Sequence, residues 1–436
     1  MTQHFISSPV QSLQGDITVP GNKSISHRAI MLGAIAKGST TVNSFLDGGD
    51  CLATVDAFEA MGVRIEKNDD SSVIIHGVGK YGLQKPTEPI NCGNSATTMR
   101  LLAGTLAAQS FDSELTGDDS LLKRPMERIR RPLVQMGADV ITQGGPPPLI
   151  IHGNQPLQGI CYEMPEASAQ VKSCLLLAGM YAAGETQIIE PSLTRDHTER
   201  MLASFSYPVR QSGNAIIINA AYECQGTHII VPGDMSSAAF FIVAATLIPN
   251  SELFIRNVGI NPTRTGLLHI LKRMGANITI SNRRQYGEEP VADLHVRHAP
   301  LHGIDIPESI VPSAIDEFPV LFIAAACATG QTLLHGAKEL RLKESDRIGA
   351  MADGLSCLGI EAKALSDGIF IRGGTVQGGV VDSRHDHRIA MAFAIAGAVA
   401  TAPVTIKHCN NVATSFPSFV ATANHINLLI REIDDE

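Results

Sequence analysis

Lys23, Ser24 and Arg28 stand within six positions of one another, directly before the apolar run 29–36. We expect a helix to begin here, with Asn22 or Ser24 as its N-cap. A helix N-terminus attracts anions, and a lysine and an arginine beside it add positive charge. The cluster therefore predicts a phosphate or carboxylate site, although a capped helix with two solvated cations would explain it equally well.

Clusters of this kind recur along the chain. The sequence Val-Pro-Gly at 19–21 returns at 231–233, 212 residues later, and again leads into an apolar run. Polar clusters stand before six such runs, at 22–24, 94–97, 168–170, 234–237, 316–317 and 386–388. If the six helices run parallel, their N-termini point in two sets of three toward one cleft between two domains. Capping explains one cluster, but six that contain Lys, Arg, His and Gln predict a binding site.

Other charged segments allow simpler interpretations. The segment 343–347 carries four charges, and such a run is by itself typical of a solvated helix face. The segment 194–200 is compatible with a capping box that has Thr194 as its cap, and Pro125 suits the first position of a helix. The two histidines of 385–387 do not predict a metal site, because no Cys-rich or Glu-rich segment stands near them.

A unit of about 70 residues repeats six times along the chain. Each copy has a polar cluster, an apolar run, a short β-rich segment and a second, amphipathic run. The β-rich segments begin 67 to 79 residues apart, at Gly38, Phe111, Gly184, Ser251, Gly330 and Ala402. Because the first runs are apolar on every side, they predict buried helices. The repeat indicates an α/β fold of two three-unit domains, with parallel helices buried and sheets outside them.

The two Val-Pro-Gly sequences mark the predicted crossings between these domains, near 19–21 and 231–233. The N-terminal domain is then expected over 20–231, and the C-terminal domain over 1–19 together with 232–436. A length of 436 residues agrees with two domains, since single cores stop growing beyond about 250–300 residues.

The composition excludes several classes of protein. A net charge of −9 argues against general nucleic-acid binding, although a cleft can still concentrate cations. No apolar run is long enough for a membrane span, and the N-terminus does not resemble a signal peptide. The eight cysteines form no Cys-x-x-Cys pair, which favours free thiols in a reducing cytoplasm over disulfides or a zinc site.

Nine motifs together resemble one family, the 5-enolpyruvylshikimate-3-phosphate synthases, over Val19 to about Pro417. In the family's order they are Gly21–Arg28, Cys92–Arg100, Lys123–Met126, Ala167–Ser173, Thr194–Glu199, Ile315–Pro319, Arg341–Arg347, Asp386–Met391 and Ser415–Pro417. The chain is most similar to the class II branch, whose members tend to tolerate the herbicide glyphosate. The resemblance implies a two-domain, inside-out α/β barrel of six βαβαββ-like units, in agreement with the repeat.

The resemblance implies transfer of the enolpyruvyl group of phosphoenolpyruvate to the 5-hydroxyl of shikimate-3-phosphate, with release of phosphate. The reaction belongs to the shikimate pathway of aromatic amino-acid biosynthesis and passes through a non-covalent tetrahedral intermediate. No metal or other cofactor is implied. Two anionic substrates held side by side need many fixed cations. We expect a monomer whose halves close on shikimate-3-phosphate and which glyphosate inhibits weakly.

The family's site residues can be carried over onto matching positions of this sequence. Shikimate-3-phosphate is expected at Lys23, Ser24, Arg28, Ser168, Gln170, Arg195, Asp316 and Lys343. Phosphoenolpyruvate is expected at Lys23, Ala96, Thr97, Arg124, Gln170, Arg347 and Arg388. By resemblance, the catalytic residues are Asp316 as the base for the 5-hydroxyl, Lys23 as a competing assignment for that base, Glu344 as the proton donor to the methylene carbon, and His387 as a hydrogen-bonding neighbour. The donor role requires a raised pKa, and Asp316 can at the same time cap a buried helix.

The sequence departs from the family pattern at three positions. Thr414 stands where many relatives have a lysine, so one phosphoenolpyruvate contact is absent or replaced. Ala169 stands where a second serine is common. Ala96 stands where many glyphosate-sensitive enzymes have glycine.

Two alternative functions remain to be weighed. The enolpyruvyl transferase that acts on UDP-N-acetylglucosamine is similar in fold, but it carries a cysteine just before its Arg-Pro, and the segment 117–125 has none. A catalytically silent anion-binding homologue is the other alternative. The presence of both Asp316 and Glu344 disfavours it.

Overall fold

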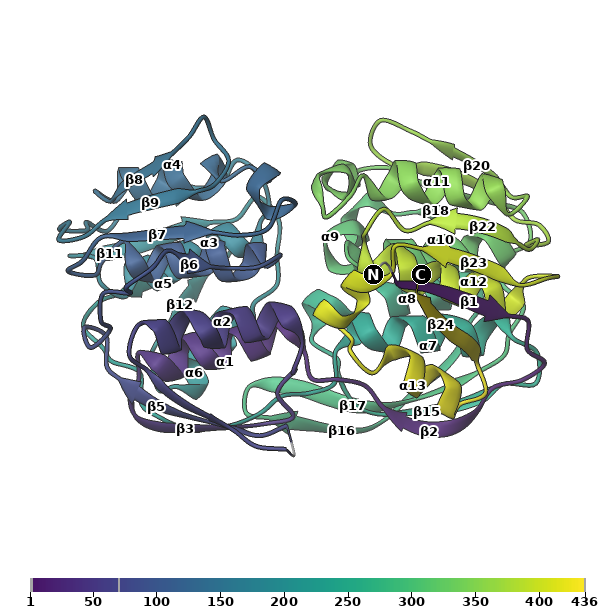
Figure 1. Cartoon of the computed structure of the whole chain (residues 1–436), viewed down its shortest axis with the longest axis horizontal. Coiled ribbons are helices and arrows are strands. Elements are labelled where there is room, and N and C mark those ends of the chain that lie inside the picture. The colour runs from purple at the N-terminus through teal and green to yellow at the C-terminus, as the bar shows by residue number, and fades with distance from the viewer. Residues whose placement is uncertain (1–2, 70, 435–436) are drawn as a thin grey trace. The chain divides into compact units, whose positions relative to one another are not determined.

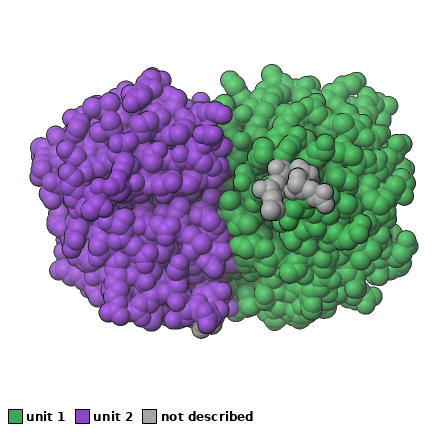
Figure 2. Space-filling model, viewed as in Figure 1, with its two compact units in different colours: residues 1–20, 232–284, 290–436 green, residues 21–231, 285–289 purple. Residues whose placement is uncertain are grey.

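Residues 3–69 and 71–434 are described by the structure, a computed structural model. The chain forms two compact units (Figure 2): unit 1 is Met1–Pro20, Pro232–Arg284 and Pro290–Glu436, and unit 2 is Gly21–Val231 and Gln285–Glu289. The segment 285–289 thus belongs to unit 2, whereas the sequence placed it in the C-terminal domain. Of the predicted domains, residues 1–2, 70 and 435–436 lie outside the described residues.

Three four-stranded sheets of one pattern occur in unit 2. Each begins with a parallel pair at one edge and continues with two antiparallel pairs. The sheets are β14–β3–β5–β4 (His228–Ile230, Lys37–Asn43, Val73–Val78, Arg64–Lys67), β6–β7–β9–β8 (Ile90–Asn91, Ser113–Thr116, Leu149–His152, Asp139–Thr142) and β10–β11–β13–β12 (Cys161–Glu163, Glu185–Ile189, Ala215–Asn219, Arg210–Ser212).

Three further four-stranded sheets occur in unit 1, each again with a parallel pair at one edge. They are β2–β15–β17–β16 (Gln14–Thr18, Glu252–Gly259, Glu289–Arg297, Asn277–Tyr286), β18–β19–β21–β20 (Asp305–Ile306, Gln331–Leu334, Ile369–Arg372, Glu361–Ala364) and β22–β23–β1–β24 (Gly379–Asp382, Val404–Lys407, Gln3–Ser8, Leu429–Asp434). The predicted fold of six repeated sheet units is confirmed.

Strands from distant parts of the sequence complete the sheets. β2 lies just before the crossing at Pro20, yet it pairs in parallel with β15 of unit 1. β14 lies just before the crossing at Val231 and pairs in parallel with β3 of unit 2. β1 pairs with both β23 and β24. In each unit, therefore, at least one sheet includes a strand that lies far from its neighbours in the sequence.

Three buried helices form the core of each unit (Figure 1): α1 (Lys23–Ala34), α3 (Ala96–Leu106) and α5 (Ala169–Gly179) in unit 2, and α7 (Met235–Leu247), α10 (Phe318–Cys327) and α12 (His387–Val399) in unit 1. The helices of unit 1 contact one another pairwise, and α3 contacts both α1 and α5. In α7 every residue from Met235 to Thr246 is buried. The all-round apolar runs of the sequence thus form core helices, as predicted.

Shorter or more exposed helices make up the rest of the helical structure. The second helix of each repeat is α2 (Gly49–Ala60), α4 (Glu127–Gln135), α6 (His197–Ser204), α8 (Gly266–Met274), α11 (Arg347–Cys357) or α13 (Phe419–His425). Short segments are α9 (Val311–Ala314) and the 3-10 turns η1 (Leu121–Lys123), η2 (Pro262–Arg264), η3 (Glu308–Ile310), η4 (Lys338–Leu342) and η5 (Asn410–Thr414). None of the helices in 3–69 and 71–434 combines the length and apolarity that crossing a membrane requires.

Side-chain caps fix the starts of the buried helices. The side chains that accept a hydrogen bond from a backbone N–H of the first turn are Asn22, Ser95, Ser168, Asp234 and Asp386. These residues belong to the polar clusters of the repeat. The clusters therefore mark helix starts, which a capping side chain stabilises by about 0.5–2 kcal/mol each.

Two local predictions at the second helices are wrong. Thr194 does not cap α6, which begins at His197. Thr194 instead donates its backbone N–H and its hydroxyl to Glu190. Pro125 is not the first residue of α4, because that helix begins at Glu127. Thr194 is therefore bound to the buried carboxylate of Glu190 and not to the first turn of α6.

Candidate active site

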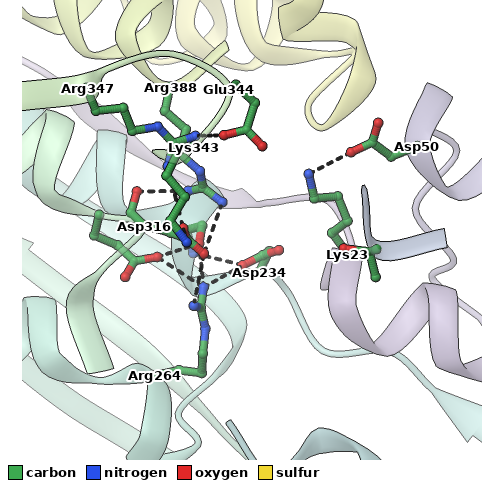
Figure 3. A network of polar contacts seen from close by, with 12 residues as sticks. Lys23, Asp50, Asp234, Arg264, Asp316, Lys343, Glu344, Arg347 and Arg388 are labelled. Carbon is green, nitrogen blue, oxygen red and sulfur yellow. Dashed lines mark hydrogen bonds and ion pairs between the residues drawn. The ribbon is translucent and has the colours of Figure 1, made fainter. Parts of the chain in front are cut away.

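One network of charged side chains joins the starts of the three buried helices of unit 1. Figure 3 shows this network and labels most of its residues. The network, called here the unit 1 cluster, consists of Asp234, Arg264, Asp316, Glu317, Lys343, Glu344, Arg347, Asp386 and Arg388. The predicted gathering of helix starts is therefore present within this unit.

Asp316 lies at the centre of the unit 1 cluster and is 12% exposed. Its carboxylate oxygens lie 3.5 Å from Arg347 Nη1, 3.7 Å from Lys343 Nζ and 3.7 Å from Arg264 Nη1. Arg388 Nη2 lies at 3.9 Å. Four cations at this range favour an ionised carboxylate, which is the form a general base requires.

Asp316, which was expected to cap a buried helix as well as to act as the base, is not the N-cap of α10. α10 begins at Phe318, its N-cap position is Glu317, and the Glu317 side chain makes no capping hydrogen bond. The backbone carbonyl of Asp316 instead accepts a hydrogen bond from Arg388 Nη1 at 3.2 Å. The position of Asp316 is set by side chains from other segments.

Arg347, the first residue of α11, has a side chain that is only 1% exposed. Its Nε donates to Asp386 Oδ2 at 2.8 Å and its Nη2 to Glu344 Oε2 at 2.5 Å. Burial lowers the pKa of Arg347, but the carboxylates of Asp386, Glu344 and Asp316 outweigh burial, so the net shift of its pKa is upward. The segment 343–347 is therefore not simply a solvated helix face.

Lys343 and Glu344 have more accessible side chains than Arg347, 19% and 20% exposed. Lys343 Nζ lies 3.1 Å from Glu339 Oε1 as well as near Asp316. The contact of Glu344 with the Arg347 guanidinium favours the ionised carboxylate, which carries no proton to donate. The predicted donor thus needs a change in this ion pair before it can act.

Arg264 is a member of the unit 1 cluster that the sequence reasoning missed. It is 4% exposed at the end of η2. Its Nη2 donates to Glu317 Oε1 at 3.0 Å and to the Ser236 hydroxyl, and lies 3.8 Å from Asp234 Oδ1. Since Nη1 also approaches Asp316, Arg264 ties the starts of α7 and α10 together.

A signal for Arg264 does exist in the repeat. Arg124, Arg195 and Arg347 were all predicted at the site, and each stands at or within three residues of the start of a second helix. Arg264 occupies the corresponding place, two residues before α8. A comparison of the repeats with one another would have found it.

Unit 2 carries its own cluster, centred on Arg28 of α1. Arg28 Nε donates to Thr198 Oγ1 at 2.7 Å, Nη2 to Ser173 Oγ at 2.7 Å, and Nη1 to the carbonyl of Ser24 at 2.9 Å. All of these acceptors are neutral. Burial lowers the pKa of Arg28 to about 10, so the guanidinium remains charged at neutral pH while its acceptors offer only partial negative charge.

The starts of α3 and α5 are linked by Gln170. Its Nε2 donates to Thr97 Oγ1 at 3.0 Å, and its Oε1 accepts from Arg100 Nη1 at 2.5 Å. Arg100 also donates to the carbonyl of Pro125 at 3.1 Å, next to the predicted Arg124. The sequence reasoning missed Arg100, although it lies within the quoted motif.

Lys23 pairs with a carboxylate that the sequence reasoning also missed. Its Nζ lies 2.9 Å from Asp50 Oδ2, with side chains 18% and 12% exposed (Figure 3). Asp50 lies in the first turn of α2, where a negative charge is favourable. This ion pair places a carboxylate directly beside the predicted Lys23.

The other predicted residues take the following places. Ser168 is the N-cap of α5, Ala96 the first residue of α3, His387 the first residue of α12, and Arg195 stands just before α6. Thr414 ends η5, and its hydroxyl donates to the carbonyl of Asn411 at 2.7 Å. Across the described ranges 3–69 and 71–434, no group of three or more His, Cys, Asp or Glu side chains is arranged to hold a metal ion.

The fold is that of the enolpyruvyl transferases. The enolpyruvyl transferase NikO from Streptomyces tendae matches over 100% of both chains with a TM-score of 0.82 at 15% identity, a likeness of fold alone. The model of the family described as EPSP synthase (3-phosphoshikimate 1-carboxyvinyltransferase) matches residues 7–422. The chain belongs to this family.

Individual relatives agree with that assignment. A 3-phosphoshikimate 1-carboxyvinyltransferase from Legionella pneumophila is 68% identical over 429 residues, 98% of this chain and 99% of the relative. One from Methylococcus capsulatus is 58% identical over 425 residues, 97% of each chain. The solved EPSP synthase from Acinetobacter baumannii is 52% identical and matches 100% of both chains with a TM-score of 0.90.

The contacts of Arg264 generate a prediction about stability. Arg264→Met leaves Glu317 buried beside Asp234 and Asp316 without its guanidinium, and should lower the free energy of unfolding by about 3–5 kcal/mol. The double variant Arg264→Met/Glu317→Gln should be less destabilised than the single variant, because it removes the unpaired charge. Calorimetric unfolding measures both. The control Arg273→Met removes an exposed cation from the same region. If Arg264→Met matched that control, the role given to Arg264 would be wrong.

Proposed function

We propose that this chain transfers the enolpyruvyl group of phosphoenolpyruvate to the 5-hydroxyl of shikimate-3-phosphate and releases phosphate. Membership of the family supports the reaction. The observation that carries the proposal is the Asp316 carboxylate held within 4 Å of four cations. Such a group can accept the hydroxyl proton while fixed cations hold anionic substrates.

In this proposal each substrate contacts residues of both units. Shikimate-3-phosphate is bound by Lys23, Ser24, Arg28, Ser168, Gln170 and Arg195 of unit 2, with Lys343 and Asp316 of unit 1 on its ring hydroxyls. Phosphoenolpyruvate is bound by Lys23, Ala96, Thr97, Arg124 and Gln170 of unit 2 and by Arg347 and Arg388 of unit 1. The support for these assignments is the match of the motifs together with the cation clusters found in each unit.

The proposed proton donor is Glu344. In the structure its carboxylate pairs with Arg347. Phosphoenolpyruvate at Arg347 would compete for that guanidinium and thereby favour protonation of Glu344. We assign the proton on the methylene carbon to Glu344 and the removal of the hydroxyl proton to Asp316. His387 is buried at the start of α12. We assign it the role of a hydrogen-bonding neighbour of the catalytic groups.

The experiment that tests the function is an assay of phosphate release. The purified chain should release phosphate from phosphoenolpyruvate when shikimate-3-phosphate is the acceptor, and should not do so with UDP-N-acetylglucosamine. The second acceptor tests the alternative transferase. Absence of release with either acceptor would favour a silent anion-binding homologue instead.

The roles of the two carboxylates make a separate prediction. Asp316→Asn and Glu344→Gln should each lower kcat by about 10²–10⁴-fold, the usual contribution of a positioned acid or base. Substrate KM values should change far less. Asp353→Asn, which removes an exposed carboxylate of α11, is the control and should keep kcat. If Asp316→Asn retained near-normal turnover, Lys23 would become the candidate base.

The class II assignment and weak inhibition by glyphosate are also proposed. Ala96 is 3% exposed at the first position of α3. Glyphosate resembles phosphoenolpyruvate in charge but is longer, so it should press against the methyl group of Ala96. Overpacking of this kind costs about 1–3 kcal/mol, which corresponds to about tenfold or more in affinity.

Ala96→Gly should therefore lower the inhibition constant for glyphosate about tenfold while changing the KM for phosphoenolpyruvate much less. Inhibition kinetics on both proteins measure the two constants. Ala103→Gly makes the same substitution further along α3 and controls for helix weakening. Equal inhibition of the variant and the parent would place any tolerance elsewhere in the site.

A monomer that closes on shikimate-3-phosphate is the proposed working form. Binding of an anion to cations of both units should draw the units together, so the radius of gyration should fall when the ligand is added. Small-angle scattering measures this change, and its forward intensity gives the mass. An unchanged radius at saturating ligand would contradict closure.

All eight cysteines are free thiols, which supports the proposal of a reducing cytoplasm.

A further inference from the structure

The turn of the β16–β17 hairpin, Gln285–Glu289, belongs to unit 2, although both strands pair within a sheet of unit 1. We call this turn the hairpin tip. β16 ends at Tyr286 and β17 begins at Glu289, so two residues connect the strands. A connection this short fixes the direction in which its side chains leave the strands.

The hairpin tip contacts α6 at three positions. Glu289 Oε1 accepts a hydrogen bond from His197 Nδ1 at 2.7 Å, and the carbonyl of Glu288 accepts one from Arg200 Nη1 at 2.7 Å. A Cβ atom on Gly287 would lie 3.1 Å from the hydroxyl of Ser204. Positions 197, 200 and 204 share one face of a helix. The tip therefore lies along α6 from its first residue to its last.

The contact between Glu289 and His197 is a buried one. The two residues are 5% and 2% exposed. A carboxylate that accepts an N–H bond in such a place makes a strong, charge-assisted hydrogen bond. Loss of either partner leaves the other polar group buried with one bond fewer. This contact therefore constrains the orientation of the first turn of α6.

That first turn also holds Arg28. Thr198, the residue after His197, accepts from Arg28 Nε, and its hydroxyl lies 2.7 Å from that of Ser173, which accepts from Arg28 Nη2. Arg195 stands two residues before His197 in the segment that leads into α6. The residues assigned to the shikimate-3-phosphate anion thus depend on where this turn lies.

We propose that the hairpin tip is a positioning element of the anion site in unit 2. Glu289, acting through His197 and the first turn of α6, holds Thr198 against Arg28 and sets the place of Arg195. Glu289 and His197 are positioning residues and touch no substrate. The proposal rests on the assignment of Arg28 and Arg195 to shikimate-3-phosphate made above.

The charge of Glu289 acts in the same direction as its hydrogen bond. Burial lowers the pKa of Arg28, and the carboxylates of Glu199 and Glu289 oppose that decrease, whereas Arg195 adds to it. Since the direct acceptors of Arg28 are neutral, these more distant carboxylates help keep the guanidinium charged. Glu199 is itself held by buried Lys172, whose Nζ lies 2.7 Å from its Oε1.

The deciding experiment compares Glu289→Gln with Glu288→Gln. The two substitutions change net charge equally, but Glu288 has an exposed side chain and meets α6 only through its backbone carbonyl. Glu289→Gln should raise the KM for shikimate-3-phosphate about threefold to tenfold, as expected from a weakened charge-assisted bond. The KM for phosphoenolpyruvate and kcat should stay within about twofold. Glu288→Gln should leave all three unchanged.

A second pair of variants tests the other side of the contact and does not depend on the folding of Glu289→Gln. His197→Ala should raise the KM for shikimate-3-phosphate as Glu289→Gln does. His197→Asn should restore it to within about twofold, because its amide can replace the Nδ1–H donor. A merely structural role would lower thermal stability without this selective change in one KM.

Arg195→Gln separates failure of this proposal from failure of the site assignment. If Arg195→Gln raises the KM for shikimate-3-phosphate but neither Glu289→Gln nor His197→Ala does, the anion site stands and the positioning role is wrong. If none of the three raises it, the site assignment is wrong and the positioning role falls with it.

Discussion

Compensation of buried positive charge is the constraint on which both clusters depend, because a guanidinium removed from water is costly unless it is paired. The two units meet this constraint differently. Arg347 is surrounded by the carboxylates of Asp386, Glu344 and Asp316, and its pKa is raised. Arg28 is bound by hydroxyl and carbonyl oxygens, and its pKa is lowered. An anion at Arg28 supplies charge that is missing, whereas an anion at Arg347 must displace carboxylates.

The repeat explains why charge gathers where it does. Each buried helix needs acceptors for the free N–H groups of its first turn, and capping side chains such as Asp386 and Ser168 supply them. In unit 1 the same carboxylate then serves a second partner, since Asp386 caps α12 and also accepts from Arg347. The polar ends of an otherwise apolar core thus gather ionised groups that are partly buried and paired.

The sequence predicted features that depend on short spacings. The helix cap at Asn22, the buried helices and the six sheet units are set by local pattern, and they are present. Predictions failed where a distant partner decided the outcome: Thr194 is taken by Glu190 rather than by the helix it precedes. Arg264 was missed because it was judged as a single charge and not as one copy of a recurring position. Glu289 was missed because nothing local shows which helix a hairpin will contact.

The course of the chain assembles each unit from segments that are far apart in the sequence. β2 and β1, from the N-terminal end, complete sheets of unit 1. The hairpin tip, residues 285–289, contacts α6 of unit 2. The range 21–231 therefore holds Arg28 and Arg195 but not Glu289, which both anchors His197 and opposes the loss of charge on Arg28. A fragment confined to 21–231 would consequently keep the direct acceptors of Arg28 but lose the buried partner of His197.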